Sequence, residues 1–162
     1  MSYQDIEAAV LAYVQAYADG LTFTDENCRR NDWRVLDAKG GPLSCHIGMG
    51  GDSRYGSEVP TEFAGAYGSH GEETALRQVA LTLAYKRGTG KGGDALPVAE
   101  LLAVTDALLA YLRADRSLGD SQIADSQVTR VTRPVEFRPQ KLEIGTHVAQ
   151  RLTLQILESI TL

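Results

Sequence analysis

Apolar side chains recur at helical spacing near the start of the chain. They fall three or four positions apart over residues 3–19, at Ile6, Val10, Tyr13, Val14 and Tyr17. Ser2 followed three residues later by Asp5 resembles a capping box with Asp in place of Glu, and Gly20 follows the last apolar position. The pattern therefore predicts a helix over roughly residues 3–19.

A second helical pattern begins at Pro97. Proline suits the first turn of a helix because its missing N–H is not needed there. The apolar stripe of this segment is formed by Val98, Leu101, Leu102, Thr105, Leu108, Leu109 and Leu112. We expect a helix over roughly residues 97–114, ended before Gly119.

Alternation of apolar and polar positions predicts two long strands. In ALRQVALTLAYKR, residues 75–87, one face carries Val79, Leu81, Leu83 and Tyr85, and the other carries Gln78, Ala80, Thr82 and Ala84. We expect the first face to be buried and the second to be partly polar. Residues 148–156 alternate in the same way and predict another amphipathic strand near the C-terminus.

Three further segments are less regular. Trp33 with Val35, and the run LSCHIGM over residues 43–49, are typical of two short strands, and the turn over residues 39–42 would make them a hairpin. Residues 126–138 favour a strand whose end lies at an edge or bend, because prolines bracket it. Residues 48–71 contain seven glycines and little periodicity, which predicts a long loop or projecting arm.

The order of these elements indicates a fold class. A helix, a hairpin, a long loop, a strand, a helix and two more strands predict an α+β domain in which two helices pack on one face of a mainly antiparallel sheet. The length of 162 residues suits one such domain, and we expect no second domain. No signal peptide or membrane segment is visible, so we expect a soluble protein made in the cytoplasm, with Cys28 and Cys45 reduced.

The net charge of −5 is unevenly distributed. The first 26 residues hold five acids and no Lys or Arg, while the acids and bases of the remaining chain cancel at 16 each. This balance argues against nucleic-acid binding through a basic face, which needs a surplus of Lys and Arg. It suits an acidic face that meets a basic face on a neighbour, although a solvated helix face would give the same pattern.

The stretch RGTGKGGD, residues 87–94, matches the dinucleotide-binding pattern G-x-G-x-x-G at Gly88, Gly90 and Gly93. The match does not extend beyond the glycines. The strand before it alternates like an antiparallel strand, and the third glycine precedes the predicted helix instead of lying inside it. The phosphate-binding GxxxxGK[ST] pattern also fails, because Gly92 stands where a hydroxyl should hold magnesium. We interpret the stretch as a mobile connection.

Other candidate chemistry is equally weak. His46, His70 and His147 lack the paired spacing of zinc ligands, and Ser44, His46 and Asp52 lack the glycine pattern around a catalytic serine. Glu72 and Glu73 are adjacent, so their side chains should point apart. We therefore expect no catalytic residue, no metal and no cofactor, and an assembly subunit is favoured over an enzyme.

The order of elements is similar to that of one protein family. The strand RQVALTLAYKR, a flexible loop, the helix PVAELLAVTDALLAYLRADRSLGD and two strands ending in THVAQRLTLQILES resemble the tail-terminator (tail-completion) proteins of tailed bacteriophages. The N-terminal helix YQDIEAAVLAYVQAYADG followed by a hairpin is similar to the start of the same family. The resemblance covers most of the chain in layout. It departs from the family in residues 48–71, which are longer and richer in glycine.

The resemblance implies a structural virion protein. Such a subunit would form a homo-oligomeric ring, expected to be hexameric, on the head-proximal end of the tail tube, and would meet the head connector. Its partners would be the tail tube protein and a head-completion or connector protein, with DNA only passing through the ring and no membrane. A phage neck or head-closure protein is the nearest alternative, and a small ligand-binding enzyme that uses residues 88–94 is the more distant one.

Four sets of residues are candidates for the subunit or partner contacts of such a ring. Heterologous ring contacts join two different patches of each subunit. The opposite patches would be an acidic set and a basic set, Asp5, Glu7 and Asp19 against Arg130, Arg133, Arg138 and Lys141. The arm would contribute a set that orders on docking, Gly50, Gly51, Arg54 and Tyr55. The glycine connection would offer Arg87 and Lys91 to a partner or to passing DNA.

Overall fold

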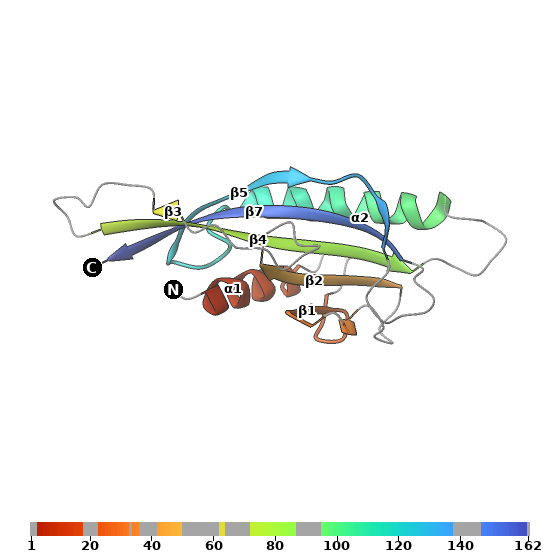
Figure 1. Ribbon diagram of the computed structural model, residues 1–162, viewed down its shortest axis with the longest axis horizontal. Coiled ribbons are helices and arrows are strands. Elements are labelled where there is room, and N and C mark those ends of the chain that lie inside the picture. The colour runs from red at the N-terminus through yellow and green to blue at the C-terminus, as the bar shows by residue number, and fades with distance from the viewer. Residues whose placement is uncertain are drawn as a thin grey trace.

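We describe residues 3–17, 23–32, 34–35, 42–49, 62–63, 72–86, 95–137 and 147–161 of the computed structural model. This part of the chain contains two helices and seven strands (Figure 1). In chain order they are α1 (Tyr3–Gln15), β1 (Cys28–Arg30), β2 (Leu43–Met49), β3 (Glu62–Phe63), β4 (Glu72–Lys86), α2 (Ala95–Ala114), β5 (Ile123–Val131), β6 (Val135–Phe137) and β7 (His147–Thr161).

The strands form one sheet with the order β1-β2-β4-β7-β5. β3 extends the sheet beside β4, and β6 extends it beside β7. Every pairing is antiparallel except that of β1 with β2. The predicted α+β class with a mainly antiparallel sheet is therefore confirmed.

β4 and β7 are the central pair of the sheet. They pair over 15 residues, from Glu72 opposite Thr161 to Lys86 opposite His147. At about 3.3 Å per residue, each strand is about 50 Å long, which gives the molecule its elongated shape (Figure 1). Both strands extend past the helices at the end where β7 finishes. Sequence alternation located both strands, but it predicted shorter ones.

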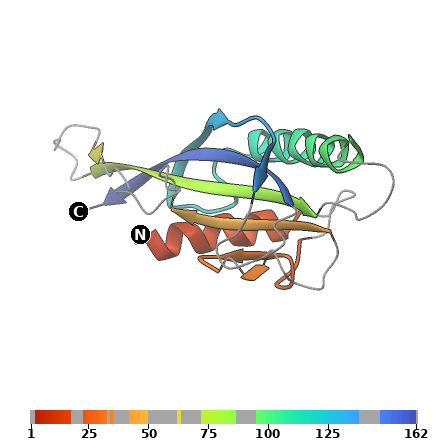
Figure 2. The ribbon, with the colours of Figure 1, turned by 45° about the vertical axis from the view of Figure 1, so that its right-hand side comes forward.

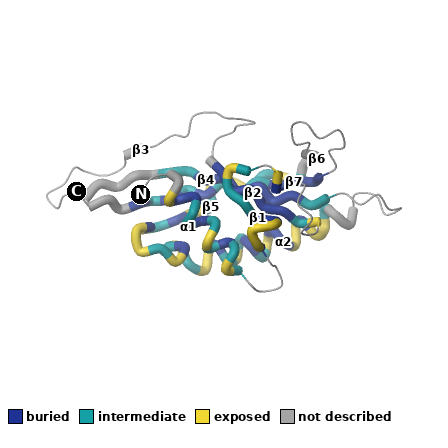
Figure 3. Tube along the Cα trace, turned by 90° about the horizontal axis from the view of Figure 1, so that it is seen from below, coloured by how far each residue is buried: buried dark blue, intermediate teal, exposed yellow. Residues whose placement is uncertain are grey.

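Both helices lie on the same side of the sheet (Figure 3), as the sequence predicted. α1 packs on β1 and β2, and α2 packs on β4, β7 and β5. The core between them contains apolar side chains from both helices and from one face of the strands, among them Ile6, Val10, Leu101, Leu108, Ile47, Leu81 and Leu152. The helices end close to their predicted bounds, α1 at Gln15 instead of residue 19 and α2 beginning at Ala95 instead of Pro97.

Two tyrosines join the helices near their C-terminal ends. The Tyr13 hydroxyl donates to the Tyr111 carbonyl at 3.0 Å, and the Tyr111 hydroxyl donates to the Tyr13 carbonyl at 2.9 Å. Their rings stack with centroids 4.3 Å apart. The pair therefore fixes the side of α2 that faces α1.

The other face of the sheet is also buried in its centre. Ala80, Thr82 and Ala84 of β4 are all buried, although the sequence predicted a partly polar face. Val35 accounts for part of this burial, because it forms a small cluster with Ala84 and Ala149 on that face. A residue from the segment after β1 thus crosses to the side of the sheet that the helices leave uncovered.

The sequence predicted a hairpin between a strand at Trp33 and Val35 and the strand over residues 43–49, and the first of these two strands is wrong. β2 lies where it was expected, but the strand beside it is Cys28–Arg30, and the two strands are parallel. β1 ends at Arg30, and the φ of 53° at the next residue, Asn31, turns the chain out of the strand. A parallel partner cannot be reached through a tight turn, so the connection to β2 is long. Trp33 lies outside the described residues.

The predicted bend in the strand over residues 126–138 is confirmed. β5 and β6 are separated by residues 132–134, so Pro134 lies in the gap between them, and Figure 2 shows the sharp change of direction. β5 is the last strand in the sheet order, as expected for an edge. The predicted arm over residues 48–71 lies outside the described residues except for the end of β2 and for β3.

Candidate interaction surfaces

The acidic N-terminal residues have different surroundings in the subunit. Asp5 is exposed at the start of α1. Glu7 is only 2% exposed, and its carboxylate accepts a hydrogen bond from the Asn31 side-chain amide at the end of β1. Glu7 therefore ties α1 to the edge of the sheet and does not offer its charge to a partner. Asp19 lies outside the described residues.

Two acids in the turn before β1 lie on the same edge as α1. Asp25 and Glu26 are both exposed, and the Gln15 side chain of α1 donates to Asp25 at 3.0 Å. Together with Asp5 they form what we call the α1 edge (Asp5, Asp25 and Glu26). Sequence reasoning counted Asp25 and Glu26 in the acidic excess but did not select them as contact residues.

The basic candidates lie at the far edge of the sheet. Arg130 of β5 and Arg133 after it are both exposed, and neither forms an ion pair with any residue in the described ranges. Arg138 and Lys141 lie outside those ranges. The two described arginines are thus exposed, and their role in a subunit contact stays a prediction.

Two acids, Asp125 on β5 and Asp115 after α2, are engaged by other residues of the chain. Arg116 donates to Asp125 at 2.6 Å. Asp115 accepts from the Ser117 hydroxyl at 2.7 Å and from the Ser117 and Gly119 amides. These bonds, with the Ser117 hydroxyl first, lower the pKa of Asp115. The positive charge of Arg130 and Arg133 is therefore not neutralised by these neighbours.

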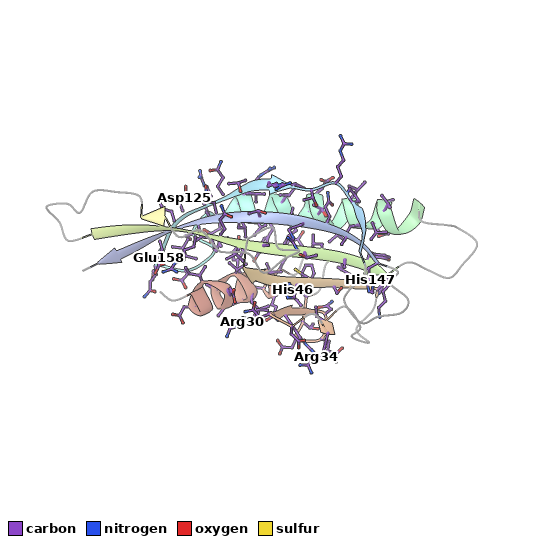
Figure 4. The ribbon with its side chains drawn as sticks, viewed as in Figure 1. Arg30, Arg34, His46, Asp125, His147 and Glu158 are labelled. Carbon is purple, nitrogen blue, oxygen red and sulfur yellow. The ribbon has the colours of Figure 1, made fainter. Side chains whose placement is uncertain are left out.

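The two charged edges lie at opposite ends of the sheet. α1 packs on β1 and β2, whereas Arg130 belongs to β5, the strand at the other end of the order. Figure 4 shows that each end also carries charges of the other sign, with Arg30 and Arg34 at the β1 edge and Asp125 at the β5 edge. Four strand spacings of about 4.8 Å place β1 and β5 about 19 Å apart. The acidic and basic candidates are thus kept apart in one subunit.

A row of polar side chains crosses the sheet on the face opposite the helices. His46, Thr82 and Arg151 are register partners on β2, β4 and β7. Burial, with the nearby Arg151 charge, lowers the pKa of His46 to about 4, so the imidazole is neutral at pH 7. A Cβ on Gly48 would lie 3.0 Å from Cε1 of His46, which explains a glycine there.

The histidine row carries no catalytic constellation within the described ranges. Ser44 lies two residues before His46 on the same face of β2, and both are buried. Asp52, the third member of the triad considered from sequence, lies outside the described residues, as does His70. His147, the first residue of β7, is buried. Both described histidines therefore belong to the packed sheet.

The two cysteines are neighbours in the core. Cys28 of β1 and Cys45 of β2 are register partners, both are fully buried, and both are free thiols. A hydrogen bond with the Cys28 thiol, and then burial, raise the pKa of Cys45 well above its usual value. Both effects favour the protonated, unreactive form of this thiol.

The glycine connection at residues 87–94 lies outside the described residues, but its flanking elements are visible. β4 before it is antiparallel to both of its neighbours. A dinucleotide-binding sheet needs adjacent parallel strands at this point, so the described pairing does not fit one. Arg87 and Lys91, and Gly50, Gly51, Arg54 and Tyr55 of the arm, likewise lie outside the described residues.

The described residues also carry two large hydrophobic side chains that are exposed. Leu102 on α2 is 40% exposed and Val131 on β5 is 41% exposed. The sequence placed Leu102 in the buried stripe of its helix, because leucine at helical spacing does not show which side lacks a neighbour. Val131 was not selected, since an edge position cannot be read from a single strand.

Comparisons with protein-family models and with curated proteins identify no relative of this chain. A scan against protein-family models finds no match to this chain, and a search of curated proteins finds no similar sequence. Among the described residues, no three His, Cys, Asp or Glu side chains come together as a metal site. Neither of the two described helices is both long and apolar enough to cross a membrane. The proposed function therefore rests on the surfaces of the described residues.

Proposed function

We propose that this protein is a structural virion protein of the tail-terminator kind. It forms a ring that caps the head-proximal end of a phage tail tube and joins the tail to the head connector. One observation carries the proposal: the α1 edge lies at one end of the sheet, and Arg130 of β5, with Arg133 after it, lies at the other end. The resemblance in element order supports the same function.

A repeating contact between identical subunits would join the α1 edge of one copy to Arg130 and Arg133 of the next. When one patch of a subunit meets a different patch of the next, the contact is heterologous, and it closes into a ring if the rotation allows. The acids of the α1 edge would attract the two arginines in this arrangement, and Arg30 and Arg34 at the β1 edge would lie outside the contact.

The remaining partners follow from the proposed position in the virion. The tail tube protein would lie below the ring, the connector or head-completion protein above it, and DNA would pass through the lumen. The arm at residues 48–71 would dock on the tube or connector, and Arg87 and Lys91 would meet a partner or the DNA. The proposed role is mechanical, so it requires no catalytic residue, metal or cofactor.

The mass of the protein in solution tests the ring. We expect the native chain to form a species several times the mass of one subunit, and Arg130→Glu combined with Arg133→Glu to shift it towards the monomer. Because the contact is electrostatic at exposed positions, raising the salt concentration should weaken the native assembly in the same direction.

A matched control separates charge from a general effect of substitution. Arg130→Lys with Arg133→Lys keeps both charges and should keep most of the assembly. Equal assembly by the Glu and Lys variants would rule out the charged contact. Binding to purified connectors but never to tail tubes would instead favour the head-closure alternative.

A further inference from the structure

The two cysteines of the chain lie side by side on neighbouring strands. Cys28 begins β1, and Cys45 of β2 is its register partner. Adjacent strands are about 4.8 Å apart, which falls inside the range of about 4.4–6.8 Å between the Cα atoms of a disulfide. The separation of the two backbones therefore permits a disulfide bond between these residues.

Both thiols also point to the same side of the sheet. They belong to the core cluster that contains Ile6 and Val10 of α1, the helix that packs on β1 and β2. Each cysteine is fully buried, and the Cys45 thiol is hydrogen-bonded with the Cys28 thiol. The two sulfur atoms are therefore neighbours in the core.

β1 is a short strand at the edge of the described sheet. It has three residues, and among the described strands it pairs only with β2. Short edge elements open locally more readily than the centre of a sheet. Opening of β1 would expose Cys28, whereas Cys45 would stay in β2, which pairs with β4 from Leu43 to Met49. Cys28 is therefore the thiol that an oxidant would reach first.

α1 is fastened to the β1 segment at two points. The Gln15 side chain donates to the Cys28 carbonyl at 3.2 Å, and the Asn31 side chain donates to the Glu7 carboxylate. A covalent bond from Cys28 to β2 would therefore also hold α1 and the exposed acids of the α1 edge in place.

We propose that Cys28 and Cys45 form a redox latch, in which a small-molecule disulfide oxidises the two thiols to an intrachain disulfide that fastens β1 and α1 to β2. This inference goes beyond the proposed function, because the latch belongs to a single subunit and does not require a ring.

Oxidised glutathione supplies a balanced reaction. The Cys28 thiolate attacks one sulfur of the oxidant, breaks its S–S bond and releases one glutathione, which leaves a mixed disulfide at Cys28. The Cys45 thiolate then attacks the Cys28 sulfur and releases the second glutathione. The two cysteines lose two protons and two electrons, and the oxidant receives them as two thiols. An added dithiol reverses the reaction.

Mass measurement of the oxidised full chain tests the latch. Reduced protein is incubated with oxidised glutathione, separated from it, and unfolded in urea with N-ethylmaleimide, which adds to every remaining thiol. We expect a monomer that is lighter by two hydrogen atoms and carries no adduct, with the fragments around Cys28 and Cys45 joined after proteolysis. Protein kept reduced should take up two N-ethylmaleimide groups, one at each cysteine.

The oxidised chain should also be more stable. A disulfide that closes the loop over residues 28–45 should raise the melting temperature by about 6–12 °C. The Cys45 amide donates to the Asn27 carbonyl and the Asn31 amide to the Ile47 carbonyl, so both amides report on the pairing of β1 with β2. Their hydrogen exchange should slow at least about fivefold, because β1 can no longer open by itself.

Two matched serine variants separate the roles of the two thiols. Cys45→Ser keeps the thiol of the edge strand and should accumulate a mixed disulfide with glutathione at Cys28. Cys28→Ser keeps the inner thiol, which is buried in β2 and has a raised pKa, and should react with glutathione at least about tenfold more slowly. Neither variant should show the rise in melting temperature.

The outcomes are distinct from those of the ring. Native protein that still takes up two N-ethylmaleimide groups after oxidation, or that holds glutathione on both cysteines, would overturn the latch. An intrachain disulfide that leaves the hydrogen exchange of the Asn31 and Cys45 amides unchanged would overturn it too. Assembly of the ring is tested separately, by the mass of the native protein in solution.

Discussion

The Arg77–Glu158 ion pair provides a sharp test of how the central strands are held. The Arg77 guanidinium donates to a Glu158 carboxylate oxygen at 3.1 Å, and the two side chains are 14% and 1% exposed. They lie on β4 and β7, where Arg77 is opposite Ile156 and Glu158 is opposite Ala75. Arg77→Met keeps a long apolar stem but removes the positive charge, so the Glu158 carboxylate remains buried without this partner.

The magnitude follows from the burial of Glu158. Breaking a buried ion pair by removing one partner destabilises proteins by about 3–5 kcal/mol. In a domain of this size, each kcal/mol shifts the melting temperature by about 2–4 °C, so the variant should melt about 6–20 °C below the native protein. Replacing both partners, as Arg77→Met with Glu158→Leu, removes the buried charge as well and should recover most of this loss.

Urea unfolding of the native protein, Arg77→Met, Glu158→Leu and the double variant gives a double-mutant cycle for the free energy of unfolding. We expect each single variant to lose more stability than the double variant, with a coupling energy of at least about 1 kcal/mol. Two single losses that simply add in the double variant would refute the role of the ion pair in holding β4 to β7.

Four further predictions concern the helices, the sheet and the thiols. Tyr13→Phe and Tyr111→Phe should each lower the free energy of unfolding, measured in urea, by about 1 kcal/mol, because each removes one hydrogen bond between the helices. Unchanged urea midpoints would contradict the two hydroxyl hydrogen bonds. Burial and the neighbouring Tyr111 raise the pKa of Tyr13 to about 12. The contribution of the protonated Tyr13 hydroxyl to the free energy of unfolding should therefore be present below pH 10 and lost as the pH rises from 10 to 12. The pKa of His46 is lowered to about 4, so its contribution to the free energy of unfolding should be present above pH 6.5 and lost as the pH falls to 4, by up to about 3 kcal/mol. A His46→Gln variant whose stability has the same pH profile as the native protein would argue against this assignment. Cys28 and Cys45 should react with a thiol reagent only as fast as the protein unfolds, and rapid labelling of the native state would disprove their burial.

Sequence periodicity located the long helix and the two long strands because buried and exposed positions alternate regularly along them. β4 and β7 alternate over most of their length, and α2 was predicted within two residues of its start. The first strand escaped prediction because Cys28–Arg30 is only three residues long and has no alternation to detect. Its parallel pairing depends on contacts distant in sequence, which a local pattern does not contain.

The candidate surfaces were predictable only in part, for the same reason. The charge excess pointed to the N-terminal segment and to Arg130 and Arg133, yet Glu7 proved to be buried against Asn31. The exposure of Leu102 depends on which side of α2 lacks a neighbour. Such features arise from the arrangement of the sheet, and residue types alone do not reveal them.

Imaging of the purified protein mixed with purified tail tubes tests the central claim most directly. The proposed function predicts a ring of subunits at one end of each tube, with the tube walls bare. Tubes whose two ends remain uncapped, beside protein that stays monomeric at the same concentration, would contradict it.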